Sequence, residues 1–520
     1  MTGLPEQPQF WNRLDVHDKR QLELKLEFRP CAGDEKSHYR VETFLFTPAS
    51  LHVDPETYPR DAFYSDIHNY VRLKTPVMGF DEVLALNQSP LVKLERKLEG
   101  LTPLAEPDVI YQAKLLSCVY RAALRRMAGR VTAHCDLPLT DKLSQAQPLD
   151  VDLRSYMFDA EKVLARYRTF TRRLQESRPV VERTRASLRL VDEYMSLSVE
   201  QFFRKAAADM ERLPRTGTYT ELRKELMADV IREETYRKEH QLRSVLSPTG
   251  DNEEYMHRIG FLKKFCMNIL FLDVRRQRRN TGIEEALFAV AAGFAMAFAT
   301  AVAFWAQARF AQLSLNFFLV LVVGYMMKDR IKEGLRRIFS AFASKRLFDR
   351  KTQILDPVTK REIGICKEKL DYGGKVPAEI SALRHADDFL TVSQGELSES
   401  VLRYQKQIIL DSEMLPRVHD GISGVTDIIR LSIDHLCRDM DDPEFAIEYV
   451  DLEALTVGRV RGAKSYLVDL ALRFTVEHEH ERQVSVQLYR LVLDRNGIKR
   501  MLRVDHEGAP DSPGPVRSVA

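Results

Sequence analysis

The sequence predicts a membrane-anchored, multidomain α+β protein in which a two-helix transmembrane hairpin separates a mostly helical cytoplasmic region from a C-terminal antiparallel β domain. Two long apolar runs lie mid-chain, helical periodicity precedes them, and alternating strand patterns follow them. We expect six segments: a small β-containing unit at 1–76, a helical bundle at 77–280, the hairpin at 281–327, a juxtamembrane amphipathic helix at 328–348, the β domain at 349–506 and a disordered tail at 507–520.

The apolar runs at 286–305 and 310–327 predict the hairpin. The first run contains no charged residue, and the second has three polar interruptions. Because a helix of roughly 20 apolar residues can cross the hydrocarbon core of a bilayer, we expect each run to be a span. Thr281 and Glu284 have the spacing of a capping box at the start of the first helix. The alternative is a hairpin buried in a soluble core, which the long uncharged run disfavours.

Basic residues flank the hairpin on both sides. They are Arg275, Arg276, Arg278, Arg279, Lys328, Arg330, Lys332, Arg336 and Arg337. The connecting loop carries only Arg309. By the positive-inside rule, we expect an integral membrane protein, for example of a bacterial inner membrane, with both termini in the cytoplasm. The helix at 328–348 also has an apolar stripe, so it either contacts anionic lipid headgroups or packs on the cytoplasmic bundle.

Small residues recur along the first apolar run. Gly293 and Ala297 form a small-xxx-small pair, and Ala295 and Ala299 repeat the same spacing. Such residues allow close approach of another helix. That helix is either the second helix of the same hairpin or a helix of another copy, which would make the protein a homo-oligomer.

The two arms differ in their residue patterns. Strict alternation at 21–29 predicts a strand, and 39–46 predicts a second one. Helical patterns lie at 149–176, 180–213, 218–246 and 253–279, the last expected to approach the membrane as one helix. Strand patterns lie at 425–436, 445–450, 465–476, 483–493 and 498–504, and 399–410 is compatible with either a helix or a strand. Asn496-Gly497 predicts a tight hairpin between the last two strands.

Composition and motifs exclude several common classes. A net charge of +3 gives no general attraction to nucleic acid, and the six cysteines have the spacing of neither a zinc site nor a disulfide framework. The chain contains no phosphate-binding P-loop, dinucleotide fingerprint, nucleophile elbow or zinc-protease motif. We therefore expect no cofactor, no metal and no catalytic residue of a common kind.

Three polar clusters have both a functional and a simpler interpretation. His478 and His480 could share a metal, the aspartates of the Asp439–Asp442 region could bind calcium, and a flexible basic loop could bind phosphate. The members of the last two clusters are Asp439, Asp441 and Asp442, and Arg459, Arg461 and Lys464. In each case a solvated turn or loop is the favoured interpretation.

These observations favour a protein that anchors cytoplasmic binding or scaffold domains to the membrane and recruits a cytosolic protein partner. One alternative is an oligomeric channel or transporter component. Another is an enzyme acting at the membrane surface, with a site in the β domain near Asp427, Asp434, His435 or the turn at 478–481. The absence of catalytic motifs disfavours the enzyme.

Overall fold

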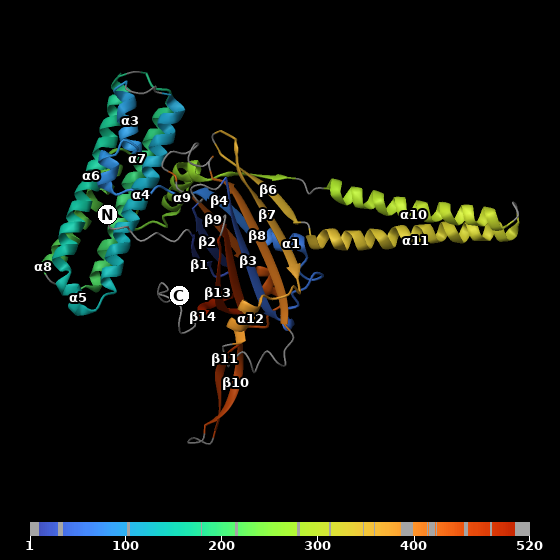
Figure 1. Cartoon of the computed structure of the whole chain (residues 1–520). Coiled ribbons are helices and arrows are strands. Elements are labelled where there is room, and N and C mark those ends of the chain that lie inside the picture. The colour runs from blue at the N-terminus through green and yellow to red at the C-terminus, as the bar shows by residue number, and fades with distance from the viewer. Residues whose placement is uncertain are drawn as a thin grey trace.

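The computed structural model of the chain describes residues 10–504, except 30–34, 101–104, 178, 214–216, 278–280, 311–313, 347, 358, 386–398, 413, 415–421, 423, 452–455 and 479–480. A central β sandwich carries a helical bundle on one side and a long helical hairpin on the other (Figure 1). The expected mixture of helices and antiparallel sheets is confirmed. The tail at 507–520 lies outside the described residues.

Two antiparallel sheets form the sandwich. The larger has the strand order β14-β13-β12-β3-β8-β7-β6-β5, and the smaller has the order β1-β2-β9-β4. Their bounds are β1 (Phe10–Asp18), β2 (Gln21–Phe28), β3 (Lys36–Pro48), β4 (Ile67–Leu73), β5 (Asp273–Gln277), β6 (Arg350–Leu355), β7 (Glu362–Tyr372), β8 (Glu399–Asp411), β9 (Val425–Ser432), β12 (Tyr466–His478), β13 (Glu481–Asp494) and β14 (Gly497–Val504). Short helices accompany them: η1 (Ala49–Leu51), α1 (Arg60–Asp66), α12 (Ala378–His385) and α15 (Asp434–Arg438).

Strands from both ends of the chain share these sheets. β3 lies between β12 and β8, and β2 pairs with β9. The segments 1–76 and 349–506, expected as separate β units, therefore contribute to one sandwich. Alternation predicts that a segment is a strand with one buried face, but it does not specify the partner strand.

The alternating strands behave as their patterns predict. Leu22, Leu24, Leu26 and Phe28 of β2 are buried between the sheets. The 399–410 segment is a strand, β8, and the 425–436 segment is β9 followed by α15 rather than one strand. The tight hairpin between the last two strands is confirmed, with Arg495 and Asn496 as its turn residues. Gly497 begins β14 and has φ +126°, a conformation that favours glycine.

A close backbone contact lies at Gly364 of β7. A Cβ atom there would lie 2.4 Å from the Ile409 carbonyl oxygen of β8. We expect Gly364→Ala to destabilise the sandwich by about 1–3 kcal/mol, because the β7–β8 backbone must shift. The thermal unfolding midpoint of the full chain in detergent measures this loss. Gly374→Ala is the control, since its Cβ would lie an ordinary 3.7 Å from Arg403; equal midpoints for the two variants would contradict the prediction.

The helical bundle lies between β4 and β5 in the chain. Its members are α2 (Phe80–Ala85), α3 (Pro90–Leu98), α4 (Glu106–Cys135), α5 (Leu139–Ser144), α6 (Ala146–Ser177), α7 (Glu182–Asp209), η2 (Met210–Arg212), α8 (Gly217–Glu239), α9 (Glu253–Met267) and η3 (Asn268–Leu270). The three long helices expected between 149 and 246 are present as α6, α7 and α8. They enclose their own apolar core with α4, which includes Leu116, Tyr167 and Leu188.

The prediction of one helix at 253–279 is wrong for the second half of that segment. α9 ends at Met267, and the chain then enters strand β5, which pairs with β6. β5 and β6 are adjacent strands, and the segment that joins them contains α10 (Thr281–Arg309) and α11 (Leu315–Arg346). The helical hairpin is therefore a long excursion between two neighbouring strands of the larger sheet (Figure 1).

A second excursion is a two-stranded ribbon, β10 (Glu444–Asp451) with β11 (Thr456–Ala463). It extends below the sandwich in the view of Figure 1, away from the hairpin. The prediction of a flexible basic loop around Arg459 and Arg461 is wrong, because both residues belong to β11. Their charges face acidic residues across the ribbon: Arg459 pairs with Glu448 at 2.9 Å and Arg461 with Glu444 at 3.4 Å.

Candidate functional site at the hairpin and its base

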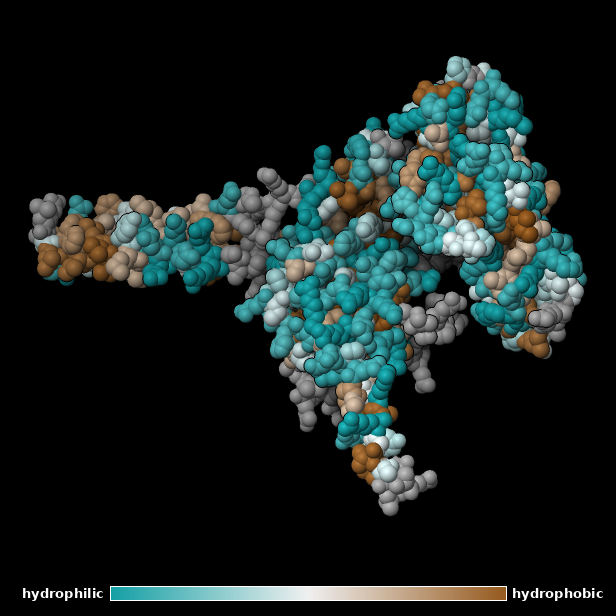
Figure 2. Space-filling view, turned by 180° about the vertical axis from the view of Figure 1, so that it is seen from behind, coloured by the Kyte–Doolittle hydropathy of each residue, from teal (hydrophilic) through white to brown (hydrophobic). Residues whose placement is uncertain are grey.

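The hairpin exposes a continuous apolar surface. The exposed side chains include Phe294, Met296, Phe304, Trp305, Leu315, Phe318, Leu319, Val323, Tyr325 and Met326. Figure 2 shows hydrophobic side chains gathered toward the free end of the hairpin and hydrophilic ones along the part nearer to the sandwich. Exposed apolar surface of this extent marks a site that contacts a membrane or a partner protein.

Two contacts give the register of the helices. A Cβ atom on Gly324 would lie 2.8 Å from Val302, and the Arg336 guanidinium lies 4.6 Å from the centroid of the Phe288 ring. The charged part of α11, which begins at Lys328, therefore runs beside the apolar first half of α10. The two helices are both apolar only in the half of the hairpin farther from the sandwich.

Among the described residues, one helix is long and apolar enough to cross a membrane, Glu285–Arg309. The expected second span at 310–327 does not satisfy this test, because α11 begins at Leu315 and its charged residues begin at Lys328. The uncharged part of α11, 315–327, rises about 20 Å, against a hydrocarbon core of about 30 Å. The hairpin of two complete spans is therefore not confirmed.

The small residues of α10 divide between two faces. Ala291, Ala295 and Ala306 are buried against α11, and Ala299 is half-buried. Gly293 and Ala297 are exposed, and a Cβ atom on Gly293 would meet nothing within 4 Å. Of the four expected packing residues, Ala295 and Ala299 thus pack within the hairpin, whereas the Gly293–Ala297 pair faces outward.

The basic flank does not form one band. Arg275 and Arg276 lie on β5 at the base of the hairpin. Lys328, Arg330, Lys332, Arg336 and Arg337 are spread along α11, and Arg278 and Arg279 lie outside the described residues. The side chains of the expected capping residues Thr281 and Glu284 also lie outside the described part of the chain, although α10 does begin at Thr281.

A polar pocket of about 390 Å³ lies at the base of the hairpin, where the two sheets diverge. β4 forms one wall, and β5, β6, β7 and β8 form the other. Its lining residues include His68, Asn69, Arg276, Arg350, Glu368 and Lys406. The backbone brings the walls together near Leu272, whose N–H donates to the Val71 carbonyl at 3.0 Å. The volume lies within the range of about 300–1,000 Å³ typical of small-molecule sites.

A row of charges crosses the floor of this pocket. In the strand register, Arg350 of β6 lies opposite Glu368 of β7, and Glu368 lies opposite Lys406 of β8. The three side chains therefore share one face of these strands. Glu368 Oε1 accepts hydrogen bonds from Asn69 Nδ2 and from the Tyr404 hydroxyl, each at 2.5 Å. The row therefore places a hydrogen-bonded carboxylate between two cations.

Lys406 continues the row into the core. Its Nζ lies 2.6 Å from Asp427 Oδ1 on β9, and both side chains are fully buried, so the ion pair joins the two sheets. Burial acts to lower the pKa of Lys406, but the charges of Asp427 and the other groups around it outweigh burial and raise that pKa. Lys406 is therefore a buried cation at neutral pH.

Arg276 and Arg350 stand at the mouth of the pocket. Among the described residues neither forms an ion pair. Arg350 donates to the Tyr64 carbonyl at 3.5 Å, and its guanidinium lies 3.9 Å from the centroid of the Tyr64 ring. Burial and the positive charge of Arg276 lower the pKa of Arg350.

The other candidates from the sequence have structural roles. Asp427 is the buried partner of Lys406, Asp434 pairs with Arg20 at 2.8 Å, and the His435 ring stacks on Tyr58. These three residues do not form one site. The alternative of an enzyme with a site near them gains no converging catalytic groups in the part of the chain that the structure describes.

The residues considered as possible metal ligands also separate. Asp441 accepts hydrogen bonds from Tyr466 and Lys464, and Asp442 pairs with Arg495 at 2.7 Å. His478 ends β12, whereas His480 lies outside the described residues. Within the described ranges, no group of three or more His, Cys, Asp and Glu side chains could hold a metal ion.

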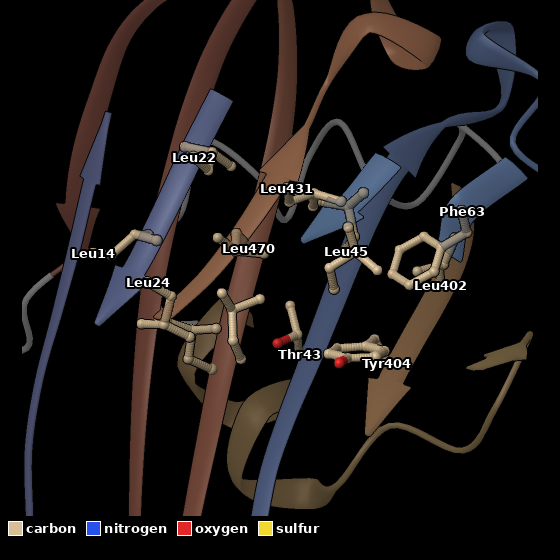
Figure 3. A pocket seen from close by; sticks show the side chains of 13 residues that line it. Leu14, Leu22, Leu24, Thr43, Leu45, Phe63, Leu402, Tyr404, Leu431 and Leu470 are labelled. Carbon is tan, nitrogen blue, oxygen red and sulfur yellow. The ribbon is translucent and has the colours of Figure 1, made fainter. Parts of the chain in front are cut away.

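The interior of the sandwich contains a small apolar cavity of about 40 Å³. Figure 3 shows Leu22 and Leu24 of β2 on one side and Leu45, Leu470 and Leu402 of the larger sheet on the other. The volume is close to that of one or two water molecules. We interpret it as a packing defect of the core rather than a ligand site.

The helical bundle holds a further set of buried charges. The fully buried Arg237 donates to Ser196 Oγ at 2.8 Å and forms an ion pair with Glu200, and Arg258 pairs with the buried Glu193. Burial lowers the pKa of Arg237 to about 10, which leaves it protonated at neutral pH. Because these charges are internally paired, they stabilise one arrangement of α7, α8 and α9 and offer no open site.

Comparisons with known proteins give no match: no protein-family model, curated protein or solved structure matches the chain.

Proposed function

We propose that the protein is a membrane-anchored binding protein, whose hairpin inserts the half farther from the sandwich into a bilayer and holds the sandwich and the helical bundle at its surface. The observation that carries this proposal is the exposed apolar surface on both helices of that half. Lipid chains would cover this surface, at a gain of roughly 25 cal/mol per Å² removed from water.

The position of the charges favours partial insertion over two complete spans. If α10 crossed the whole hydrocarbon core beside α11, the charged residues from Lys328 to Arg337 would lie within it. Each lysine or arginine near the centre of a bilayer costs roughly 2.5–3.5 kcal/mol on insertion scales. In the partial arrangement these residues instead meet the headgroups, where anionic lipids attract them.

Partial insertion from the cytoplasmic side leaves both arms, and hence both termini, in the cytoplasm. The binding role is supported by the ribbon of β10 and β11. Phe445, Ile447, Tyr449 and Val460 share one exposed apolar face of that ribbon. A cytosolic protein is the partner that we propose for these domains.

The depth of Trp305 tests the proposal. We expect the full chain with Trp11→Phe to float with liposomes in 1 M salt, because apolar insertion does not depend on charge. We also expect its Trp305 fluorescence to be quenched most strongly by lipids brominated deep in their acyl chains, since Trp305 lies near the tip of the inserted half.

The outcomes separate the arrangements. Strongest quenching by shallow bromines together with flotation would favour two complete spans, which place Trp305 near the opposite headgroups. Failure to float at any lipid composition would contradict the membrane anchor and leave a protein partner as the cover of the hairpin.

A further inference from the structure

The pocket at the base of the hairpin brings together two arginines, neither of which forms an ion pair within the part of the chain that the structure describes. Arg276 on β5 pairs with Thr352, and Arg350 lies two residues before Thr352 on β6, so both side chains point to the same face. Diagonal neighbours in a sheet are roughly 7–8 Å apart. Guanidinium groups at this spacing can both donate to one phosphate placed between them.

The nearby carboxylates are already engaged. Asp349 accepts hydrogen bonds from Arg60 at 2.8 Å, from the Leu370 N–H at 2.7 Å and from the Tyr64 hydroxyl at 3.1 Å. Glu368 accepts from the neutral Asn69 and Tyr404 side chains, so it keeps its charge and attracts Arg350. The lining still holds three cations, Arg276, Arg350 and Lys406, against this one carboxylate, and an anion would relieve the repulsion between the two arginines.

The floor of the pocket offers groups that suit hydroxyls. The Asn69 side-chain oxygen is buried and has no hydrogen-bond partner among the described residues. Both hydrogen bonds to Glu368 are accepted by its Oε1, and Oε2 accepts neither of them. A hydroxyl group on a ligand could donate to the Asn69 oxygen or to Glu368 Oε2, and an unpaired buried oxygen gains most from such a donor.

We propose that this pocket binds the phosphate ester of a polyol, with the phosphate between Arg276 and Arg350 and the hydroxyl groups toward Asn69 and Glu368. The same chemistry occurs in soluble sugar or glycerol phosphates and in the headgroups of anionic lipids. The proposal goes beyond the membrane anchor and holds for any depth of the hairpin.

Binding of sn-glycerol 3-phosphate to the full chain, in nanodiscs of phosphatidylcholine, tests the proposal by calorimetry. We expect tighter binding than for inorganic phosphate, which lacks the hydroxyl groups, and no binding of glycerol. Arg276→Gln and Arg350→Gln are each expected to weaken binding about tenfold or more, because each removes a charge-assisted hydrogen bond. If the ligand is instead a lipid headgroup, the same variants lose retention of phosphatidylglycerol in native mass spectrometry, while soluble glycerol phosphate binds neither form.

Arg275→Gln is the matched control, since Arg275 is the neighbour of Arg276 on β5 and does not line the pocket. We expect it to bind like the unchanged protein. Equal weakening by Arg275→Gln would overturn the pocket in favour of general charge attraction. Absence of binding in both the soluble and the lipid measurements would overturn the proposal, and circular dichroism shows whether each variant is folded.

Discussion

Lys406→Met is expected to lower the free energy of unfolding of the sandwich by about 3–5 kcal/mol, the range for removal of one partner of a buried ion pair. Methionine has a similar length, so packing changes little. Asp427 would remain fully buried without its cation, and its Oδ2 already has no hydrogen-bond partner among the described residues. Denaturant unfolding followed by the fluorescence of Trp11 on β1, in a Trp305→Phe background, measures the loss.

The loss in Lys406→Met should depend on pH. Burial raises the pKa of Asp427, and Lys406 is the strongest influence opposing that rise, so removal of Lys406 raises the pKa further. The folded variant then binds a proton that the unfolded chain releases near its ordinary pKa. Relative to the unchanged protein, the stability of the variant is therefore least reduced at acidic pH, and the deficit due to Asp427 grows as the pH rises through its folded pKa.

A double variant separates the missing charge from the missing side chain. Lys406→Met with Asp427→Val removes both charges, and replacing a whole buried pair by apolar groups is often neutral or stabilising. We expect most of the lost stability to return. A double variant as unstable as Lys406→Met would show that packing, and not the uncompensated carboxylate, carries the effect.

The sequence predicts the strands of the sandwich well but not this ion pair or the pocket beside it. Lys406 and Asp427 lie in separate strands of different sheets, and alternation alone assigns each charge to an outward face. The pocket combines residues from β4 through β8, which are separated by the helical bundle and the hairpin in the chain. Arg350, Glu368 and Lys406 occupy positions that the alternation of their strands directs inward, and this could have indicated a polar site. The three residues can be recognised as neighbours only when the order and register of β6, β7 and β8 are known.

The hairpin gives the opposite lesson. Its apolar runs predict two helices and their order correctly, because hydrophobicity and length are local properties. The depth of insertion is not local. It depends on which residue of α10 lies beside Lys328, and that follows from packing such as Gly324 against Val302.

Phe318→Asp is expected to weaken binding of the full chain to liposomes by about 2.5–3.5 kcal/mol, close to 100-fold or more. Phe318 lies near the tip of α11 and is 61% exposed. In the proposed arrangement this position is deep in the hydrocarbon, where a carboxylate is most costly. Liposome titration followed by flotation measures the change.

Phe294→Asp is the matched control because it removes the same side chain at nearly the same exposure, 62%, from the half of α10 nearer to the sandwich. Phe294 lies beside the charged part of α11, so we expect a loss of less than about threefold in affinity. Both positions lie near the centres of the apolar runs at 286–305 and 310–327. Two complete spans would therefore make the two variants equally damaging, whereas partial insertion makes only Phe318→Asp severe. Since the substitution is identical and the exposures match, the difference between the two losses reports the depth of each position and not a general effect of added charge.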